Sequence, residues 1–367
     1  MGNIKNRVYY TYNDLTIEPG VVSHIQHRSE CIPWDDEGKL PLFTAPMNTV
    51  INKGNFDLFE TNKIHAILPR TESLEDRIKY STQGKWAAYS LNEFSDVFCN
   101  EDDKLPTEHK IKALIDVANG HMSIIFDLAK KAKKIYGDDL ILMGGNIANP
   151  LTYELYAEAG FSYIRVSIGT GSGCLSSSNT SIHVPIATLI NDMAAFKKEL
   201  EGKYDKLPCI IADGGIRNYR DIIKALALGA DYVMCGSIFA KMLESAADKI
   251  PEFGVPRLTN EMINSDDLKY GNGRWMLGDE ELGEIYATFY GMASREGQIA
   301  LNGAKTKTSE GLKKSLRVEY TMSGWVRNMT DYLRSAMSYD GTKTLDEFRE
   351  KAVLIVNSEN AINAVNK

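Results

Sequence analysis

The sequence lacks the features of membrane-spanning, secreted and nucleic-acid-binding proteins. It has no stretch of about eighteen apolar residues, so we expect no transmembrane helix and no membrane partner. The net charge is −7 and no long basic run occurs, which argues against a nucleic-acid partner. The N-terminal stretch MGNIKNRVYYTYNDL lacks the apolar core of a signal peptide, so the sequence predicts a cytoplasmic protein.

Cysteine is also scarce, and its pattern excludes a disulfide framework. The five cysteines are odd in number, scattered along the chain and without a CxxC pair. This pattern indicates a reducing compartment. The cysteines are Cys31, Cys99, Cys174, Cys209 and Cys235.

Short apolar runs recur along the chain, and each is followed by Gly, Asn, Asp or Pro, as is typical of buried parallel strands. Eight such runs predict eight strands. They lie within 41–46, 63–68, 85–91, 112–120, 139–146, 163–169, 207–215 and 231–237.

Helical patterns separate these runs, at 122–137, 150–160 and 218–230, with cap and stop residues at their ends. Eight strands alternating with helices predict an α/β fold of the (β/α)8 TIM-barrel class, as a single domain over 1–367. A doubly wound open sheet is the alternative, because counting strands does not prove closure. After the last strand, a flap or loop region spans about 241–315. Within it, 264–284 is predicted to be a long loop or flap over one barrel end.

Ligands of TIM barrels bind at the C-terminal ends of the strands, and phosphate commonly binds after the seventh and eighth strands. Here those ends carry Asp213-Gly214-Gly215 and Gly236-Ser237. Together with Ser172 of the sixth loop, Gly215, Gly236 and Ser237 are candidates to cradle one phosphate. Asp213 is a candidate to bind a ribose diol. The alternatives are ordinary turn glycines and a turn-forming aspartate bonded to its own backbone.

The sixth of these loops contains Cys174, in the stretch SIGTGSGCLSSSNTSIHVP (167–185), for which we expect neither a stable helix nor a core strand. A thiolate in a mobile loop at the catalytic face is a strong nucleophile if nearby donors lower its pKa. Cys209 and Cys235, inside predicted strands, fit the alternative of buried structural cysteines. His121 and His183 are candidate partners of Cys174, although a lone histidine is more often structural.

Several stretches together give the sequence a family resemblance. YIRVSIGTGSGC (163–174) and IADGGIRNYRDIIKALALGADYVMCGS (211–237) resemble the inosine-monophosphate dehydrogenase/guanosine-monophosphate reductase family, as do YTYNDLTIEPG (10–20) and PLFTAPMNTV (41–50). The likeness spans roughly residues 8 to 348. It implies a barrel enzyme whose loop cysteine attacks C2 of a purine nucleotide, with a nicotinamide cofactor exchanging hydride at that carbon.

Within this family, the sequence is closer to the reductases. Only about sixteen residues separate KIHAIL from KWAAYSL, too few for the regulatory insertion usual in dehydrogenases. LIDVANGH (114–121) and FYGMAS (289–294) resemble the reductase pattern, and 295–311 has no Arg-Tyr pair to activate water. The resemblance therefore implies NADPH-dependent conversion of guanosine monophosphate (GMP) to inosine monophosphate (IMP) and ammonia. The alternatives are an IMP dehydrogenase using NAD and a non-catalytic purine-nucleotide-binding barrel.

The resemblance also implies roles for individual residues and a homotetramer. Cys174 would be the nucleophile, with Ser176 and Glu296 relaying protons to the leaving amine. Backbone carbonyls of Gly169, Gly171 and Cys174 would hold a monovalent cation such as K⁺. The residues implied to bind the nucleotide are Met47, Asn146, Ser172, Asp213, Gly215, Gly236, Ser237, Tyr290, Gly291 and Met292. Those implied to face the cofactor are Asp116, Asn119 and Gly120.

The sequence departs from the family pattern at three places. Ser176 stands where the family has threonine, and LPRTES has Arg70 but no lysine near the end of the second strand. The family's acidic residue aligns with Arg295, one place before Glu296. We hypothesise that a one-residue bulge or a shifted helix start brings Glu296 to the site, since a regular helix would turn it away by about 100°.

Overall fold

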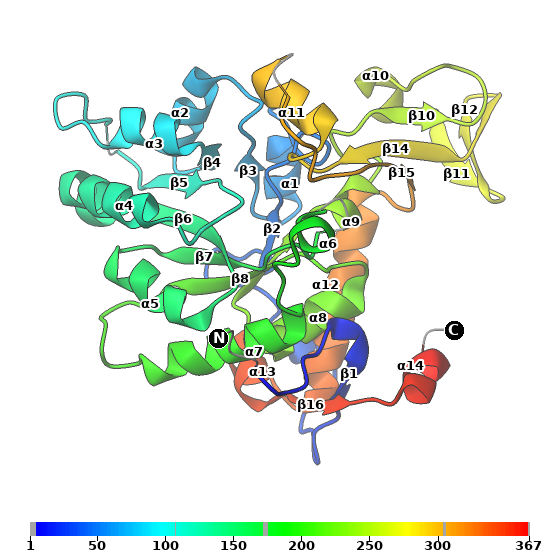
Figure 1. The fold of residues 1–367 in the computed structure, drawn as a ribbon. Helices are drawn as coiled ribbons and strands as arrows, with labels where there is room; N and C mark the ends of the chain where they lie inside the picture. The colour runs from blue at the N-terminus through cyan, green and yellow to red at the C-terminus, as the bar shows by residue number, and fades with distance from the viewer. Residues whose placement is uncertain (1–4, 107, 172–174, 304–305, 366–367) are drawn as a thin grey trace.

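A computed structural model describes residues 5–106, 108–171, 175–303 and 306–365. Its central feature is an eight-stranded parallel sheet in the order β2-β9-β8-β7-β6-β5-β4-β3 (Figure 1). All eight predicted strands are confirmed. They are β2 (Leu42–Thr44), β3 (Ile67–Leu68), β4 (Trp86–Tyr89), β5 (Ile111–Ile115), β6 (Leu140–Ile147), β7 (Tyr163–Val166), β8 (Cys209–Asp213) and β9 (Tyr232–Cys235).

The sheet closes on itself between its first and last strands. Phe43 of β2 forms a parallel bridge with His65, two residues before β3. The His65 N–H donates to Leu42 O at 3.0 Å, and its carbonyl accepts from Thr44 N at 2.9 Å. Closure excludes the doubly wound open sheet, and the fold is a (β/α)8 TIM barrel.

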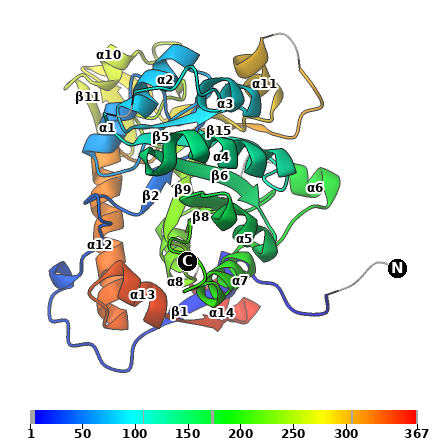
Figure 2. The ribbon, with the colours of Figure 1, turned by 90° about the vertical axis from the view of Figure 1, so that its left-hand side faces the viewer.

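Helices cover the outside of the barrel, and Figures 1 and 2 show α2 to α5 lying along the outer side of β4 to β6. The three predicted helices are confirmed as α4, α5 and α8. The helices between the strands are α1 (Phe56–Thr61), α2 (Leu74–Thr82), α3 (Leu91–Phe98), α4 (Ser123–Tyr136), α5 (Pro150–Glu158), α6 (Ser176–Thr180), α7 (Ile186–Glu199) and α8 (Tyr219–Ala227).

Local sequence signals explain where these helices begin. Asn149 caps α5 by accepting a hydrogen bond from the Leu151 N–H, and Pro150 occupies the first helical position. The side chain of Asn218 caps α8 in the same way, by accepting from the Asp221 N–H. After β9, the chain continues through α9 (Ser237–Ala240) and the flap region to α12 (Met322–Asp340), which packs beside α8. α13 (Leu345–Lys351), β16 (Val353–Val356) and α14 (Glu359–Val365) follow, and β16 pairs with β1 (Leu15–Glu18).

The barrel interior is filled by side chains, mostly large and apolar. Phe43 lies at its centre, stacked on the His65 ring at 4.7 Å and within 6.0 Å of the Trp86 ring. At the N-terminal end of the barrel, His65 Nε2 is 2.5 Å from Asp35 Oδ2, and both side chains are buried. This end of the barrel carries no predicted site residue.

The flap region contains two antiparallel sheets, β10-β14-β15 and β11-β12-β13, which extend from the barrel in Figure 1. The sequence predicts a long loop or flap at 264–284, and the prediction of a loop is wrong because antiparallel strands form there. Asn272 and Gly273 form the two-residue turn of a hairpin, both at positive φ, and Asn-Gly between strands is a strong hairpin signal. The strands are β10 (Lys249–Pro251), β11 (Leu268–Gly271), β12 (Arg274–Leu277), β13 (Glu280–Gly283), β14 (Ile285–Tyr290) and β15 (Lys313–Arg317), and the short helices are α10 (Asn260–Ile263) and α11 (Arg295–Asn302).

The prediction of no helix in 167–185 is also wrong, because α6 forms a short helix there. Serine hydroxyls stabilise this turn locally. Ser178 Oγ donates to Leu175 O at 3.0 Å, and Ser177 Oγ donates to Gly169 O at 2.9 Å. The left-handed conformation of Ser181 ends the helix.

Candidate active site

A pocket of about 240 Å³ opens at the C-terminal ends of the barrel strands. We call it the barrel-end pocket. Its walls come from the ends of the strands and from the flap segment that follows β14. Nine residues predicted from the sequence line it: Met47, Asp116, Gly171, Asp213, Gly215, Gly236, Ser237, Gly291 and Met292.

The backbone at the end of β8 is shaped by glycine. Gly214 has a φ of +120°, and a Cβ there would lie 2.3 Å from Thr170 Oγ1. Ser167 Oγ and Thr170 Oγ1 both donate to the Asp213 carbonyl. The Gly215 N–H donates to Thr170 O at 3.2 Å. The loop after β7 is therefore packed directly against the end of β8, and only glycine fits at the crossing point.

Asp213 is the acidic side chain at this end of β8. Asn146 Nδ2 donates to Asp213 Oδ2 at 2.7 Å, and Arg165 Nη1 lies 3.9 Å from the same oxygen. Burial raises the pKa of Asp213, against the opposing effects of Arg165 and Asn146. The side chain keeps about one-fifth of its surface exposed, toward the pocket that it lines.

A second cavity of about 570 Å³, which we call the side pocket, lies next to the barrel-end pocket. Glu310 lines both cavities. The side pocket is lined by residues of the loops after β5, β6 and β7, with apolar side chains such as Ile168, Ile182 and Val184 beside polar ones. The predicted residue Asn119 is among them, with His121, Asn149, Thr180, Ser181 and His183.

The two histidines of the side pocket are held by structural hydrogen bonds. His121 Nε2 accepts from the Ala148 N–H at 3.2 Å, so Nδ1 carries the proton and donates to Thr152 Oγ1 at 3.0 Å. Burial lowers the pKa of His121, which favours the same neutral ring. His183 Nδ1 donates to Ile168 O at 3.1 Å.

Several other predicted residues lie beside the pockets without lining them. Asn146 contacts the barrel-end pocket through Asp213, and the Tyr290 hydroxyl accepts from Asn48 Nδ2 at 2.8 Å. Gly120 has a packing role, since a Cβ there would lie 2.7 Å from Asn146 O. The Gly169 carbonyl accepts from Ser177 Oγ. Ser172 and Cys174 lie outside the described residues, and Ser176 begins α6.

The hypothesised bulge at Glu296 is absent. Ser294 caps α11 by accepting from the Gly297 N–H, and the helix runs regularly from Arg295 to Asn302. Among the described residues that line the two pockets, neither Arg295 nor Glu296 appears. Because α11 is a regular helix from Arg295 onward, Glu296 is turned about 100° away from Arg295 around the helix axis.

Sequence reasoning missed two charged residues of the site, Arg165 and Glu310. Arg165 lies in β7 and lines the barrel-end pocket. Glu310 precedes β15; its N–H donates to Ala293 O at 3.0 Å, and its carbonyl accepts from Leu175 N at 2.8 Å. Glu310 is thus tied both to the flap and to the residue after Cys174. A charged residue inside an apolar strand, as in YIRVSIG, was the available signal for Arg165.

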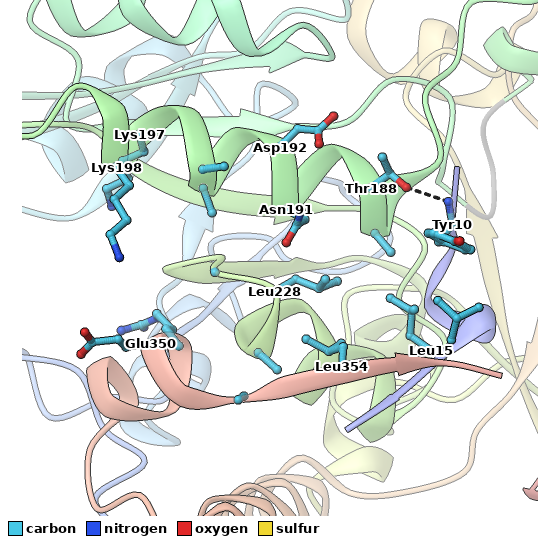
Figure 3. A pocket seen from close by; sticks show the side chains of 18 of the residues that line it. Tyr10, Leu15, Thr188, Asn191, Asp192, Lys197, Lys198, Leu228, Glu350 and Leu354 are labelled. Atoms are coloured by element: carbon cyan, nitrogen blue, oxygen red, sulfur yellow. Dashed lines mark hydrogen bonds between the residues drawn. The ribbon is translucent and has the colours of Figure 1, made fainter. Parts of the chain in front are cut away.

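A larger groove, of about 890 Å³, lies on the outside of the barrel between α7 and β16 (Figure 3). Small apolar residues form its floor, and charged residues such as Lys198 and Glu350 stand at its edges. None of the predicted site residues lines it. The barrel-end pocket, at the strand ends where TIM barrels bind their ligands, is therefore the candidate active site.

Within the described part of the chain, no helix is long and apolar enough to cross a membrane. The fold and the pocket define the class of protein: a TIM barrel with a pocket walled by glycines, apolar side chains and a few charged residues at the C-terminal ends of its strands. The family profile described as "IMP dehydrogenase / GMP reductase domain" matches residues 103–366. The chain belongs to this family of oxidoreductases.

Curated relatives carry both names of the family. The chain is 26% identical to the GMP reductase of Staphylococcus carnosus over 362 residues, covering 95% of this chain and 96% of that protein. It is 27% identical to the GMP reductase of Staphylococcus saprophyticus over 364 residues, covering 95% of each. It is 27% identical to the inosine-5'-monophosphate dehydrogenase of Halalkalibacterium halodurans over 330 residues, covering 86% of this chain but only 62% of that protein.

Proposed function

We propose that this protein is a GMP reductase, which converts GMP to IMP and ammonia with NADPH as the reductant. The observation that carries the proposal is the barrel-end pocket, because the structure gathers there nine of the residues that the family resemblance implies. The short connection between β3 and β4, which contains only α2, supports the reductase over the dehydrogenase. The relatives named GMP reductase are also matched over nearly their whole length.

The nucleotide would lie with its phosphate at the ends of β8 and β9. The N–H groups of Ser237 and Ile238, at the start of α9, would supply donors there, and Gly236 would give the phosphate close access. Asp213 would accept hydrogen bonds from the ribose hydroxyls. Met47, Gly291 and Met292 would contact the base. Ser172 and Tyr290 would contribute further donors to the phosphate.

The chemistry begins with Cys174. Its thiolate attacks C2 of the guanine ring, and the exocyclic amine leaves as ammonia once it has been protonated, with Ser176 and, in place of Glu296, Glu310 as the proposed relay. Loss of the amine leaves the purine bound through C2 to the cysteine sulfur. Forming this covalent intermediate splits one difficult displacement into two easier steps. When bound, NADPH supplies a hydride to C2. The carbon–sulfur bond then breaks, which releases IMP and restores the thiolate.

The side pocket fits the nicotinamide cofactor because it adjoins the barrel-end pocket and shares Glu310 with it. Asn119 and Asn149 offer amide groups that suit a carboxamide and ribose hydroxyls. Asp116 lines the barrel-end pocket on the side of this loop, and Gly120 keeps the loop against β6. A K⁺ ion on the carbonyls of Gly169, Gly171 and Cys174, a homotetramer and a cytoplasmic location stay predictions.

The direct test is turnover by the purified protein with each nucleotide and cofactor. We expect NADPH oxidation in the presence of GMP, with one ammonia released for each NADPH consumed. Reduction of NAD with IMP, and no reductase activity, would instead assign the dehydrogenase. Binding of both nucleotides without turnover in either direction would assign the non-catalytic barrel.

Cys174→Ala tests the covalent step. We expect this variant to lose turnover while GMP affinity, measured by calorimetry, stays within a few fold of the wild type. Cys209→Ala is the matched control, because burial raises the pKa of the Cys209 thiol to about 12 and the residue lies in β8. The control should keep turnover and lose only some stability. Full activity of Cys174→Ala would exclude the covalent mechanism.

A further inference from the structure

Arg165 is a buried cation between two carboxylates of the candidate active site. Its residue is 4% exposed, although it lines the barrel-end pocket. Nη2 donates to Asp116 Oδ1 at 2.9 Å, and Nη1 lies 3.9 Å from Asp213 Oδ2. Asp116 follows β5 and Asp213 ends β8, so one guanidinium on β7 joins side chains at the ends of two strands that lie on either side of it in the barrel, β8 next to β7 and β5 beyond β6.

Other groups around Asp213 do not replace this cation. Asn146 donates a neutral hydrogen bond to Asp213 Oδ2. The titratable groups that act on Asp213, besides Arg165, are Asp116, Tyr12 and Cys235. Each of these three is neutral or negative. Among the residues the structure describes, Arg165 is thus the positive charge placed against the Asp213 carboxylate.

We propose that Arg165 is a positioning residue, which holds Asp213 in the orientation and charge state needed to accept hydrogen bonds from the ribose of the nucleotide. The inference rests on the proposed function, which places the ribose at Asp213. It adds a role for Arg165, which acts through Asp213 rather than on the reacting atoms. By binding Asp116 as well, the same side chain fixes the loop that leads from the barrel-end pocket to Asn119 of the side pocket.

The electrostatic balance at Asp213 explains why the positive charge matters. Burial raises the pKa of this carboxyl, and Arg165 is the first of the groups that oppose the rise. Without Arg165, the balance shifts further toward the protonated form. A protonated carboxyl carries a donor in place of one acceptor oxygen, so it is a poorer partner for two ribose hydroxyls.

The test is the pH dependence of GMP affinity in full-length Arg165→Met, measured by calorimetry relative to the wild type. We expect the affinity of the variant to be at least about tenfold below that of the wild type near pH 6, and the gap to narrow toward pH 9, since one pKa unit corresponds to a factor of about ten. A purely structural role would lower affinity equally at every pH. Arg165→Lys restores the charge and should recover most of the wild-type profile. If Arg165→Met does not fold, Arg165→Gln takes its place with the same expected profile.

Arg77→Met is the matched control. Arg77 is equally buried, at 2% exposed, and is paired with Glu93 away from both pockets. The Arg77→Met substitution should lower thermal stability and leave the pH profile of GMP affinity unchanged. In the Asp213→Asn background, Arg165→Met should cost little further affinity, because the carboxylate through which Arg165 acts is absent.

Three outcomes would overturn the inference. A wild type that binds neither GMP nor IMP removes the proposed function, and the inference with it. If the wild type binds GMP and the ratio of its GMP affinity to that of Arg165→Met is constant across pH, the inference is wrong and the proposed function stands. Full additivity of Arg165→Met and Asp213→Asn also removes it and leaves the proposed function standing.

Discussion

Glu310 and Glu296 are two acidic residues on the same flap segment, and their positions differ. Glu310 lines both pockets and is hydrogen-bonded through its carbonyl to the residue after Cys174, whereas Glu296 lies in the first turn of α11, with Ser294 as its cap. A carboxyl that protonates a leaving amine must lie within hydrogen-bond reach of it. Variants of the two residues therefore test which carboxyl protonates the leaving amine.

We expect Glu310→Gln to slow turnover at least about tenfold, because a general acid typically contributes about 10²–10⁴-fold. The Glu296→Gln variant is the direct comparison, since it makes the same chemical change fourteen positions earlier in the same flap segment. Single-turnover rates of ammonia release, with GMP affinity measured in parallel, distinguish the two. A slow Glu296→Gln variant beside an unaffected Glu310→Gln variant would instead assign the relay to α11.

At the scale of elements, the ion pair of Arg77 and Glu93 joins α2 to α3. Arg77 Nη2 is 2.5 Å from Glu93 Oε1, and the Ser90 N–H also donates to this carboxylate. Burial opposes ionisation of Glu93, but these partners outweigh it and lower its pKa from 4.5 to about 2. The carboxylate therefore stabilises the folded state above its unfolded pKa, and this contribution is lost as the pH falls toward 2.

We expect Glu93→Gln to reduce the free energy of unfolding by about 2 kcal/mol near neutral pH, because it leaves the buried guanidinium of Arg77 without its charged partner. The difference from the wild type should shrink as the pH falls from about 4.5 to about 2, because Glu93 is protonated first in the unfolded chain and only near pH 2 in the folded protein. Urea denaturation at several pH values measures it. Glu75→Gln, an exposed position on α2, should change stability by less than about 0.5 kcal/mol throughout. A difference that stays constant down to low pH would contradict the linkage.

The flap sheets show where element-level prediction from the sequence failed. The Asn272-Gly273 turn was a readable hairpin signal, but LKYG and RWML have little of the apolar alternation that usually marks strands. The small core that holds them, around Trp275 and Leu282, assembles residues far apart in sequence. Such a core is visible only once the chain is folded.

At the scale of the whole molecule, side chains in the barrel interior join one strand to several others, both adjacent and across the barrel. Phe43 of β2 contacts the rings of Trp86 on β4, Tyr163 on β7 and Tyr232 on β9. We expect Phe43→Ala to lower the free energy of unfolding by about 3–5 kcal/mol, since a fully buried ring is lost and a cavity remains. Phe253→Ala is the control, because that ring is 53% exposed on the flap. Similar unfolding midpoints in denaturant for the two variants would show that the interior does not stabilise the barrel in this way.

The barrel itself could be predicted from the sequence because its strands are buried on both faces. A strand such as Cys209–Asp213 therefore appears as a continuous apolar run that ends at a turn. The ends of these runs also located Asp213, Gly236 and Ser237. Glu310 and the Arg165 contacts could not be predicted, because they depend on how distant loops meet over the barrel. Closure through His65, outside any regular strand, is a further feature that no local pattern encodes.

The two ends of the flap segment beside the barrel-end pocket are joined by a backbone hydrogen bond. Ala293 and Glu310 both line the pocket, and the Glu310 N–H donates to the Ala293 carbonyl. The chain from 294 to 309 is therefore a loop closed at its base by the same backbone pair that shapes the pocket. The entropic cost of closing a loop rises only slowly with the length of the loop. The length of this segment can therefore change at low entropic cost, but Gly297 within it is packed against Gly291 and Met292, so a replacement that adds bulk there would reshape the wall of the pocket.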